Sequence, residues 1–283
     1  MKSFYLKSKK ATKLTKIVQI SDSHMIVVDE TDKENYTKQK ERKLFFERES
    51  LARTGEVHYA EAKLSEAVEY ARQSDLTIFT GDIIEFPTAP NVNKMVEYFS
   101  KLDDYLYTFG NHDYMDYTLK ESALSQYEKN VHLFKDVIKN DLEFAVKEVN
   151  GISVVAMDNS RFQFSLSQYE RLKKMFDEGR EIVLSMHIPL YHPTLDFIGQ
   201  KKVNAVADTC GMAYGLGLKN SATPITKAVI DLIKENHEQV LAILVRHNHF
   251  DAVVPYYENV VEYVCAPTYL NDFYEFIIEP EKD

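Results

Sequence analysis

Five short polar clusters stand out in this chain of 283 residues, because each directly follows a run of apolar residues. Their carboxylate, imidazole and amide groups are ligands for borderline or hard cations such as Mn, Fe, Zn or Co. Cysteine is absent from all five, which argues against a structural zinc knot. The clusters are Asp22-Ser23-His24, Gly81-Asp82, Gly110-Asn111-His112-Asp113, His187 and His247-Asn248-His249.

Two of the clusters place ligand-type side chains two residues apart. In an extended segment such side chains point to the same side, so Asp22 could act with His24, and His247 with His249. Two metal ions about 3.5–4 Å apart polarise a phosphoryl group and lower the pKa of a bridging water from about 15.7 to roughly 7. The residue types therefore suit cleavage of phosphate esters by a metal-bridging hydroxide at neutral pH.

The apolar runs before the clusters are typical of strands in an α/β fold, since helical patterns separate them. Strands of such a sheet present ligands in the crevice beyond their carboxyl ends, so all five clusters could converge there. We predict strands at residues 17–20, 76–79, 105–109, 152–157, 182–186 and 241–245.

Local signals support this alternation. Residues 60–71 carry their apolar side chains on one helical face. Ser165 with Gln168 forms a capping-box signature at the start of another helix, and Thr223 precedes a proline at the first position of a third. The Asn-Gly pair at 150–151 lies between two strand-like runs and predicts a two-residue hairpin.

Two segments fit no regular pattern. Residues 27–58 form a charged insertion, which we interpret as a solvated helix or excursion, with the alternative that part of it caps the site. Residues 191–221 contain proline and glycine without clear periodicity, and we expect an active-site loop that borders the substrate entrance. Neither an internal repeat nor a low-complexity linker divides the chain, so one domain over residues 1–283 is the simplest organisation.

Taken in order, the motifs D-x-H, G-D, G-N-H-D, H and H-x-H resemble those of the calcineurin-like metallophosphoesterase superfamily. They spread from residue 22 to residue 249, and the tetrapeptide G-N-H-D alone is expected by chance in about one chain per thousand. The resemblance implies an α/β fold in which two mixed β-sheets pack as a sandwich flanked by helices, in a single domain.

The resemblance also implies two divalent or trivalent metal ions, with Mn, Fe or Zn as the leading candidates. His112 would hydrogen-bond a phosphoryl oxygen or protonate the leaving alkoxide, and Asp113 would orient its imidazole. The implied ligands are Asp22, His24, Asp82 and His249 for one ion, and Asp82, Asn111, His187 and His247 for the other, with Asp82 bridging.

One position departs from the family pattern. The last motif usually reads G-H-x-H, whereas this chain has Arg246 where the glycine belongs. Glycine often marks a close backbone approach or a positive φ, which arginine does not easily supply. The guanidinium either turns outward to water or a nearby acid, which we favour, or reaches across the mouth to an anionic group of the substrate. His192, shortly after His187, could also line the substrate mouth.

The composition bounds the partners. A formal net charge of −10 argues against nonspecific binding to nucleic acids or acidic membranes, whereas metal ions would attract a small anionic substrate. The apolar run at residues 17–20 is too short for a signal segment, and no stretch approaches the ~20 residues of a membrane helix. Cys210 and Cys265 form no staple framework, so we expect a cytoplasmic protein with two free thiols.

The leading functional hypothesis is a phosphodiesterase that acts on a small phosphorylated substrate, for which a nucleotide is one candidate. In size and in its G-N-H-D motif the chain resembles small bacterial-type phosphodiesterases. A phosphomonoesterase or protein phosphatase on the same fold is the alternative, and it needs extra cations to hold a dianion; where Arg161 and Arg246 point stays open. A catalytically inactive scaffold would lack ligands, yet every expected ligand type is present. The oligomeric state is also left open.

Overall fold

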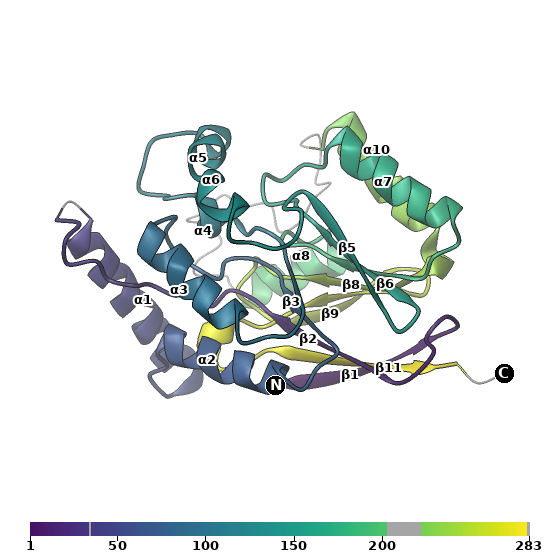
Figure 1. Cartoon of the computed structure of the whole chain (residues 1–283), viewed down its shortest axis with the longest axis horizontal. Helices are drawn as coiled ribbons and strands as arrows, with labels where there is room; N and C mark the ends of the chain where they lie inside the picture. Colours follow the sequence, from purple (N-terminus) through teal and green to yellow (C-terminus); the bar gives the residue numbers. More distant parts are fainter. Residues whose placement is uncertain (34, 203–221, 282–283) are drawn as a thin grey trace.

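Two β-sheets lie face to face in the computed structural model, and helices cover their outer faces (Figure 1). The structure describes residues 1–33, 35–202 and 222–281. Both sheets are mixed, and they form a single domain with the flanking helices. This confirms the predicted fold class.

The first sheet is built from β1 (Lys2–Ser8), β2 (Thr15–Ile20), β3 (Leu76–Phe79), β4 (Tyr105–Tyr107) and β11 (Tyr274–Pro280). Within the described ranges its order is β1-β11-β2-β3-β4. β2, β3 and β4 are parallel to one another, so their carboxyl ends meet at one edge. β11 runs antiparallel to β2, and β1 pairs with β11 in parallel.

The second sheet is built from β5 (Phe144–Val149), β6 (Ile152–Met157), β7 (Ile182–Ser185), β8 (Val240–Val245), β9 (Ala252–Tyr257) and β10 (Val260–Val264). Its order in the described part of the chain is β5-β6-β7-β8-β10-β9. β6, β7, β8 and β10 are parallel, and β5 and β9 are antiparallel to their neighbours. All six predicted strands are therefore confirmed, with ends that shift by at most two residues.

Four helices of 11 or 12 residues cover the outer faces of the sheets. α2 (Ala60–Ala71) and α3 (Ala89–Phe99) pack on the first sheet, and α7 (Leu166–Asp177) and α10 (Pro224–Glu235) pack on the second. The other helices of the described ranges are α1 (Tyr36–Thr54), α4 (Asn111–Tyr114), α5 (Ala123–Asn130), α6 (His132–Lys135) and α8 (Pro193–Lys202), with 3₁₀ turns η1 (His237–Gln239) and η2 (Thr268–Leu270).

Alternating side chains of the strands fill three buried layers. In β3, Ile78 faces the second sheet and Phe79 faces the helices. In β7, Val183 faces the first sheet and Leu184 faces the helices. Because the period of a strand is two residues, each sheet can be buried on both faces only if its strands are apolar throughout. Burial on both faces therefore explains why the strands are continuous apolar runs in the sequence.

The local turn and cap signals are confirmed. Asn150 and Gly151 have φ values of 51° and 91°, as a type I′ turn requires, and they join β5 to β6. A Cβ at Gly151 would lie 2.1 Å from the carbonyl oxygen of Lys10, so only glycine fits there. Ser165 and Gln168 form the predicted capping box of α7.

Both irregular segments contain helices: the one in residues 27–58 agrees with the predicted solvated helix, whereas the one in residues 191–221 was not predicted. Residues 27–58 contain α1, which contacts the candidate site described below, so this segment is more than a solvated excursion. Residues 193–202 of the expected active-site loop form α8, because Pro193 occupies the first position of the helix, where no backbone N–H is needed. Residues 203–221 lie outside the described part of the chain. The edge strand β1 was not predicted, since its outward side chains are polar and exposed.

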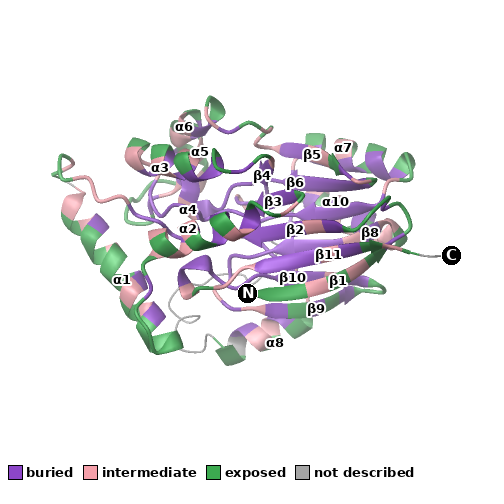
Figure 2. Cartoon of the chain, turned by 60° about the horizontal axis from the view of Figure 1, so that its bottom comes forward, coloured by how far each residue is buried: buried purple, intermediate pink, exposed green. Residues whose placement is uncertain are grey.

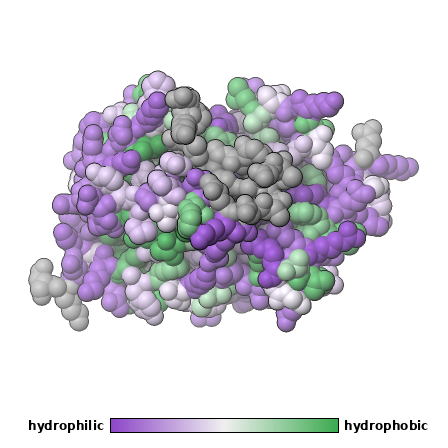
Figure 3. All heavy atoms as spheres, turned by 180° about the vertical axis from the view of Figure 1, so that it is seen from behind, coloured by the Kyte–Doolittle hydropathy of each residue, from purple (hydrophilic) through white to green (hydrophobic). Residues whose placement is uncertain are grey.

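Burial falls off from the sheets toward α1, which carries much exposed surface at one end of the molecule (Figure 2). The face seen from behind is mostly hydrophilic, with hydrophobic side chains scattered among the polar ones (Figure 3). Among the helices of the described ranges, none is both long enough and apolar enough to span a membrane.

Candidate metal centre

The five polar clusters all lie at the carboxyl ends of parallel strands. Three of them follow β2, β3 and β4, which are neighbours in the first sheet. The other two follow β7 and β8, which are neighbours in the second sheet. Since both sheets end at the same side of the sandwich, side chains from residues 22 to 249 meet in one place.

The first group of ligand-type side chains contains Asp22, His24, Asp82 and His249, whose candidate ligand atoms all lie within 4.8 Å of one another. The Nε2 atoms of His24 and His249 are 3.1 Å apart. Asp22 Oδ1 lies 3.4 Å from Nε2 of His249 and 3.7 Å from Nε2 of His24. These atoms surround a position that suits one cation.

The second group contains Asp82, His187 and His247, with the same spacing limit of 4.8 Å. His187 Nε2 lies 3.3 Å from Asp82 Oδ2 and 3.2 Å from Nδ1 of His247. Asn111 joins this group, because its Oδ1 lies 3.1 Å from His187 Nε2, while its Nδ2 donates a hydrogen bond to Tyr117 Oη. Asp82 belongs to both groups.

The two aspartates each use one oxygen for anchoring and leave the other for the centre. Asp22 Oδ2 accepts a hydrogen bond of 2.7 Å from Ser21 Oγ, and Asp82 Oδ1 accepts one of 2.8 Å from the backbone N–H of His112. Their other oxygens are buried and have no hydrogen-bond partner among the described residues. Buried carboxylate oxygens without a partner are costly, so the donor set fits a pair of cations.

Backbone strain is concentrated at the same residues. A positive φ is rare for residues other than glycine, and it costs about 1–3 kcal/mol where the surroundings enforce it. Five candidate ligands nevertheless have φ values between 46° and 75°. They are Asp22, His24, Asp82, His247 and His249.

The glycines of the motifs allow two loops to touch. Gly81 has a φ of 84°, and a Cβ on it would lie 2.1 Å from the backbone nitrogen of Gly110. A Cβ on Gly110 would in turn lie 2.2 Å from Oδ1 of Asp82. The loops after β3 and β4 therefore pack backbone against backbone, which brings Asp82 beside Asn111.

Three of the four histidines of the centre are oriented by a contact at the far ring nitrogen, whereas the far nitrogen of His247 is buried without a hydrogen-bond partner among the described residues. His24 Nδ1 donates to Glu85 Oε2 at 2.7 Å, and His187 Nδ1 donates to the carbonyl oxygen of Thr80 at 2.7 Å. His249 Nδ1 pairs with the hydroxyl of Tyr269 at 3.2 Å. Such contacts set the tautomer of a metal-binding imidazole and leave Nε2 free for the ion.

The four histidines of the centre divide into two pairs, one with raised pKa values and one with lowered pKa values. Burial lowers the pKa of His24, but hydrogen bonds with Asp22 and Glu85 raise it to about 10. Burial likewise opposes the charge on His187, yet Asp82 raises its pKa to about 9. Burial lowers the pKa of the two remaining histidines, to about 3 for His247 and well below the usual range for His249, and the charged partner of each adds to this effect.

Asp113 does not face His112, so the role expected for it is corrected. Its Oδ2 accepts the backbone N–H groups of Asp82 and Gly110, each at 2.8 Å. Its Oδ1 accepts the N–H groups of the next two residues after Asp82, at 2.9 and 3.1 Å. A carboxylate that holds four backbone donors fixes the loop that carries Asp82, and it does not orient an imidazole.

Glu85 occupies the position expected of Asp113. Its Oε2 lies 3.1 Å from Nδ1 of His112, whose side chain remains 15% exposed at the edge of the centre. Burial by itself raises the pKa of Glu85, but the neighbouring imidazoles of His112 and His24 hold it well below its usual range. Sequence reasoning missed Glu85, although its place three residues after Asp82 in an otherwise apolar run was a usable signal.

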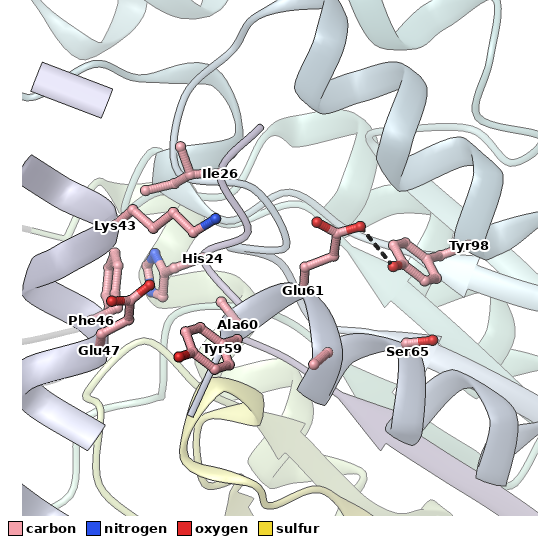
Figure 4. Close-up of a pocket in the computed structure, with 11 residues that line it drawn as sticks. His24, Ile26, Lys43, Phe46, Glu47, Tyr59, Ala60, Glu61, Ser65 and Tyr98 are labelled. Carbon is pink, nitrogen blue, oxygen red and sulfur yellow. Dashed lines mark hydrogen bonds between the residues drawn. The ribbon is translucent and has the colours of Figure 1, made fainter. Parts of the chain in front are cut away.

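Helix α1 closes one side of the centre. Arg42 Nε lies 2.5 Å from Oε1 of Glu85, and the ring of Phe46 stacks on His24 with centroids 4.7 Å apart. A cavity of about 380 Å³ opens beside His24, with Lys43 and Phe46 on α1 facing the start of α2 across it (Figure 4). Part of the charged insertion therefore caps the site, which was the alternative interpretation.

Arg246 faces an acid, as one of the expected positions had it, but it does so in the interior and does not turn outward. Its side chain is 0% exposed, so it reaches neither solvent nor substrate. The guanidinium Nε lies 3.2 Å from Oδ2 of Asp22, whereas His24 and His249 face Oδ1, and Nη1 donates to the carbonyl oxygen of Phe250 at 3.0 Å. The backbone of Arg246 has no positive φ, because the left-handed conformation falls on His247 and His249 instead. Glycine is therefore not required here.

His192 also lies apart from the ligand groups. Its Nδ1 accepts the backbone N–H of Thr194 at 3.2 Å, which caps the first turn of α8, and its ring faces Tyr256 at 6.4 Å. Burial and the nearby Lys234 lower its pKa. None of these neighbours belongs to either ligand group, so the described contacts give His192 a local structural place rather than one at the centre.

Comparison with known proteins agrees with this fold. The family model of calcineurin-like phosphoesterases matches residues 15–216. A dimetal phosphatase from Danio rerio superposes with a TM-score of 0.55 at 12% identity, over 93% of this chain and 92% of that one. A purple acid phosphatase from yellow lupin (Lupinus luteus) seeds gives a TM-score of 0.53 at 12% identity, over 91% of this chain and 44% of that one. At such identities the likeness shows the fold alone. A search of curated protein sequences found no significant match.

Proposed function

The chain belongs to the calcineurin-like phosphoesterases, and on that premise we propose that it is a dinuclear phosphodiesterase. The family hydrolyses phosphoric esters with a pair of metal ions. In this chain we assign the first ion to the first ligand group, which contains Asp22. We assign the second ion to the second ligand group, which contains Asp82, Asn111, His187 and His247. The support is the pair of buried, unpartnered oxygens of Asp22 and Asp82, which the two ligand groups surround.

The preference for a diester rests on where two arginines point. A phosphomonoester is a dianion, and an enzyme that prefers it needs cations beside the metal ions. Arg246 is buried against Asp22, and the guanidinium of Arg161 lies over the ring of Tyr127 with its carbon 4.5 Å from the centroid. Arg246 is therefore not available to hold a second negative charge on the phosphoryl group, and Arg161 faces an aromatic ring instead of either ligand group.

The ligand set favours Mn, Fe or Zn over Mg or Ca. Imidazole nitrogens make up half of the proposed contacts, and they suit borderline transition metals better than hard alkaline-earth ions. When bound, the ions would neutralise phosphoryl charge and activate a water molecule for attack. The mixed nitrogen and oxygen set does not select one pair among these metals.

His112 is the proposed proton donor to the leaving alkoxide. Its backbone N–H is tied to Asp82 Oδ1 at 2.8 Å, so its ring lies at the edge of the centre, and its Nδ1 faces Glu85 at 3.1 Å. An imidazole that faces a carboxylate through one ring nitrogen can present its other ring nitrogen to the leaving group. Asp113 supports this arrangement indirectly, by fixing the loop that carries Asp82.

The substrate is proposed to be small and phosphorylated, with a nucleotide as one candidate. The cavity beside His24 holds about 380 Å³ and includes the rings of Phe46, Tyr59 and Tyr98, which suits a compact organic group. A formal net charge of −10 disfavours long polyanions such as nucleic acids. Location in the cytoplasm is part of the proposal and rests on the low cysteine content.

A pair of substrates with the same leaving group tests the proposal. We expect the chain reconstituted with Mn²⁺ to cleave bis-p-nitrophenyl phosphate with a kcat/KM about tenfold or more above that for p-nitrophenyl phosphate. Both activities should disappear when metal is removed with a chelator. A higher kcat/KM for the monoester would refute the diester preference, and full activity in metal-free protein would refute the metal centre.

A further inference from the structure

Arg246 is the largest side chain among those that are fully buried in the described part of the chain. It sits between the end of β8 and the ligand His247, and its backbone N–H donates to the carbonyl oxygen of His187 at 2.8 Å. The residue is thus fixed within the loops that carry three proposed ligands. A buried cation in this place requires a physical reason, since burying an unpaired charge is costly.

The guanidinium links the two sheets. Its Nε lies 3.2 Å from Asp22, which follows β2 in the first sheet. Its Nη1 donates to the carbonyl oxygen of Phe250, which follows β8 in the second. Nη2 is buried without a hydrogen-bond partner among the described residues, so the Asp22 carboxylate is the main compensation for the charge.

The two oxygens of Asp22 are therefore divided between two positive partners. Oδ2 faces the guanidinium, and Oδ1 faces His24 and His249 at the proposed first metal position. We propose that Arg246 is a positioning residue for that position: it keeps Asp22 aimed before an ion arrives, and it weakens the binding of the ion there. The inference rests on the proposed metal centre and adds a device that sets its affinity.

Two opposite effects on metal affinity follow from this contact, and the structure indicates which is larger. Loss of the guanidinium would remove a repulsion between two positive charges in a buried site, which strengthens binding. It would also remove one restraint on Asp22, which weakens binding. Asp22 keeps other restraints, because Ser21 Oγ donates to the same oxygen at 2.7 Å and the backbone N–H of Asp22 donates to Gly81 at 3.0 Å. The charge effect should therefore dominate.

The stability of the metal-free protein should depend on Arg246 in the opposite sense, because there the guanidinium stabilises. Without ions, Arg246 balances the buried carboxylate of Asp22, so its loss leaves that carboxylate without its strongest partner. A bound ion would replace the missing charge. Neutralising Arg246 should therefore destabilise the metal-free protein and increase the stabilisation that metal confers, since ligand stabilisation grows as Kd falls.

The test compares Arg246→Gln, which removes the charge but keeps a polar side chain, with Arg246→Lys, which keeps the charge. The full chain is stripped with a chelator, titrated with Mn²⁺ by calorimetry, and melted with and without Mn²⁺. We expect Arg246→Gln to bind one of the two ions on the order of tenfold more tightly and to melt several degrees lower when metal-free. Arg246→Lys should stay within about threefold of the unmodified chain in Kd.

Unchanged or weaker Mn²⁺ binding by Arg246→Gln would overturn the inference. If that variant is unfolded without metal, refolding upon addition of Mn²⁺ supports the inference and failure to refold overturns it. The double variant Asp22→Asn/Arg246→Gln should be more stable without metal than either single variant, because both charges of the pair are gone. Failure of the unmodified chain to take up any metal would instead refute the proposed centre together with this inference.

Discussion

Oδ2 of Asp82 lies 3.3 Å from Nε2 of His187. The same oxygen lies 3.9 Å from Nε2 of His24, and it has no hydrogen-bond partner among the described residues. One buried oxygen thus faces both ligand groups, which is the geometry that a bridging ligand requires.

Replacement of this bridging group should therefore affect both ions. We expect Asp82→Asn to lower metal content at both positions and to reduce kcat by orders of magnitude, measured by elemental analysis and steady-state kinetics. The fold should survive, because the amide oxygen can still accept the backbone N–H of His112. Asp22→Asn is the matched control, and it should weaken only one ion. Two tightly held ions and normal turnover in Asp82→Asn would contradict the assignment of the bridge.

The positions of the ligands could be predicted because each lies directly after a strand. Once the strands at Ile17, Ile78 and Leu106 are recognised as parallel and buried, their carboxyl ends must meet, and the following polar residues must meet with them. This part of the argument needs only local sequence and the geometry of a parallel sheet. It extends to the hairpin and the helix caps, which are also local.

Contacts between distant segments could not be predicted in the same way. The stacking of Phe46 on His24 depends on how α1 folds back over the sheet, and the charged residues of α1 indicated a cap over the site only as an alternative. The pairing of β1 with β11 joins Lys2 to Tyr274 across almost the whole chain. The direction of Arg246 depends on Asp22 in the other sheet, so its local sequence indicated exposure.

Loss of His112 should affect substrates according to their leaving group. If His112 protonates the leaving alkoxide, His112→Gln should reduce kcat/KM for alkyl esters by about 100-fold or more and for p-nitrophenyl esters much less, because nitrophenolate leaves without a proton. A series of esters with leaving groups of graded pKa measures this dependence. Equal losses across the series would assign His112 a role in binding or structure instead.

Asp113 provides the contrasting case. Its carboxylate accepts four backbone N–H groups, and an amide nitrogen in Asp113→Asn would place a donor against donors. We expect this variant to lose about 1–3 kcal/mol of unfolding free energy. Its remaining activity should fall by the same factor for good and poor leaving groups, which steady-state kinetics can show. Sensitivity to the leaving group, as expected for His112→Gln, would restore the discarded role of Asp113.

Metal binding should release protons. His24 and His187, with pKa values raised to about 10 and about 9, carry protons at neutral pH in the metal-free protein. Each must lose its proton before Nε2 can bind an ion, so affinity should rise as pH increases toward 9. Calorimetric titration with Mn²⁺ at pH 7, in buffers of different ionisation enthalpy, should report about two protons released by the histidines per two ions, and up to about one more from a bridging water. A heat that does not depend on the buffer would contradict these protonation states.

Glu262 should make stability depend on pH in a region away from the ligand groups. Its side chain is 0% exposed on β10, where Oε1 accepts the backbone N–H of Leu190 at 2.8 Å and Oε2 has no hydrogen-bond partner among the described residues. Burial raises its pKa from 4.5 to about 8, against the smaller effect of the hydrogen bond from Leu190. The folded protein therefore keeps a proton on Glu262 that the unfolded chain loses.

The sign of the effect follows from this difference. Below pH 4.5 Glu262 is protonated in both the folded and the unfolded chain, so the stability associated with its proton is fully present. This stability is lost as pH rises toward 8. Glu262→Gln keeps the acceptor for Leu190 without an ionisable group, so it should match the unmodified chain near pH 4.5 and exceed it by a few kcal/mol at pH 8. Thermal unfolding across this range, at saturating Mn²⁺, measures the difference.

The exposed Glu258 in the neighbouring turn is the control, and Glu258→Gln should leave the stability unchanged at every pH. A stability gain of Glu262→Gln that stays constant from pH 4.5 to 8 would show that Glu262 is not held in its neutral form.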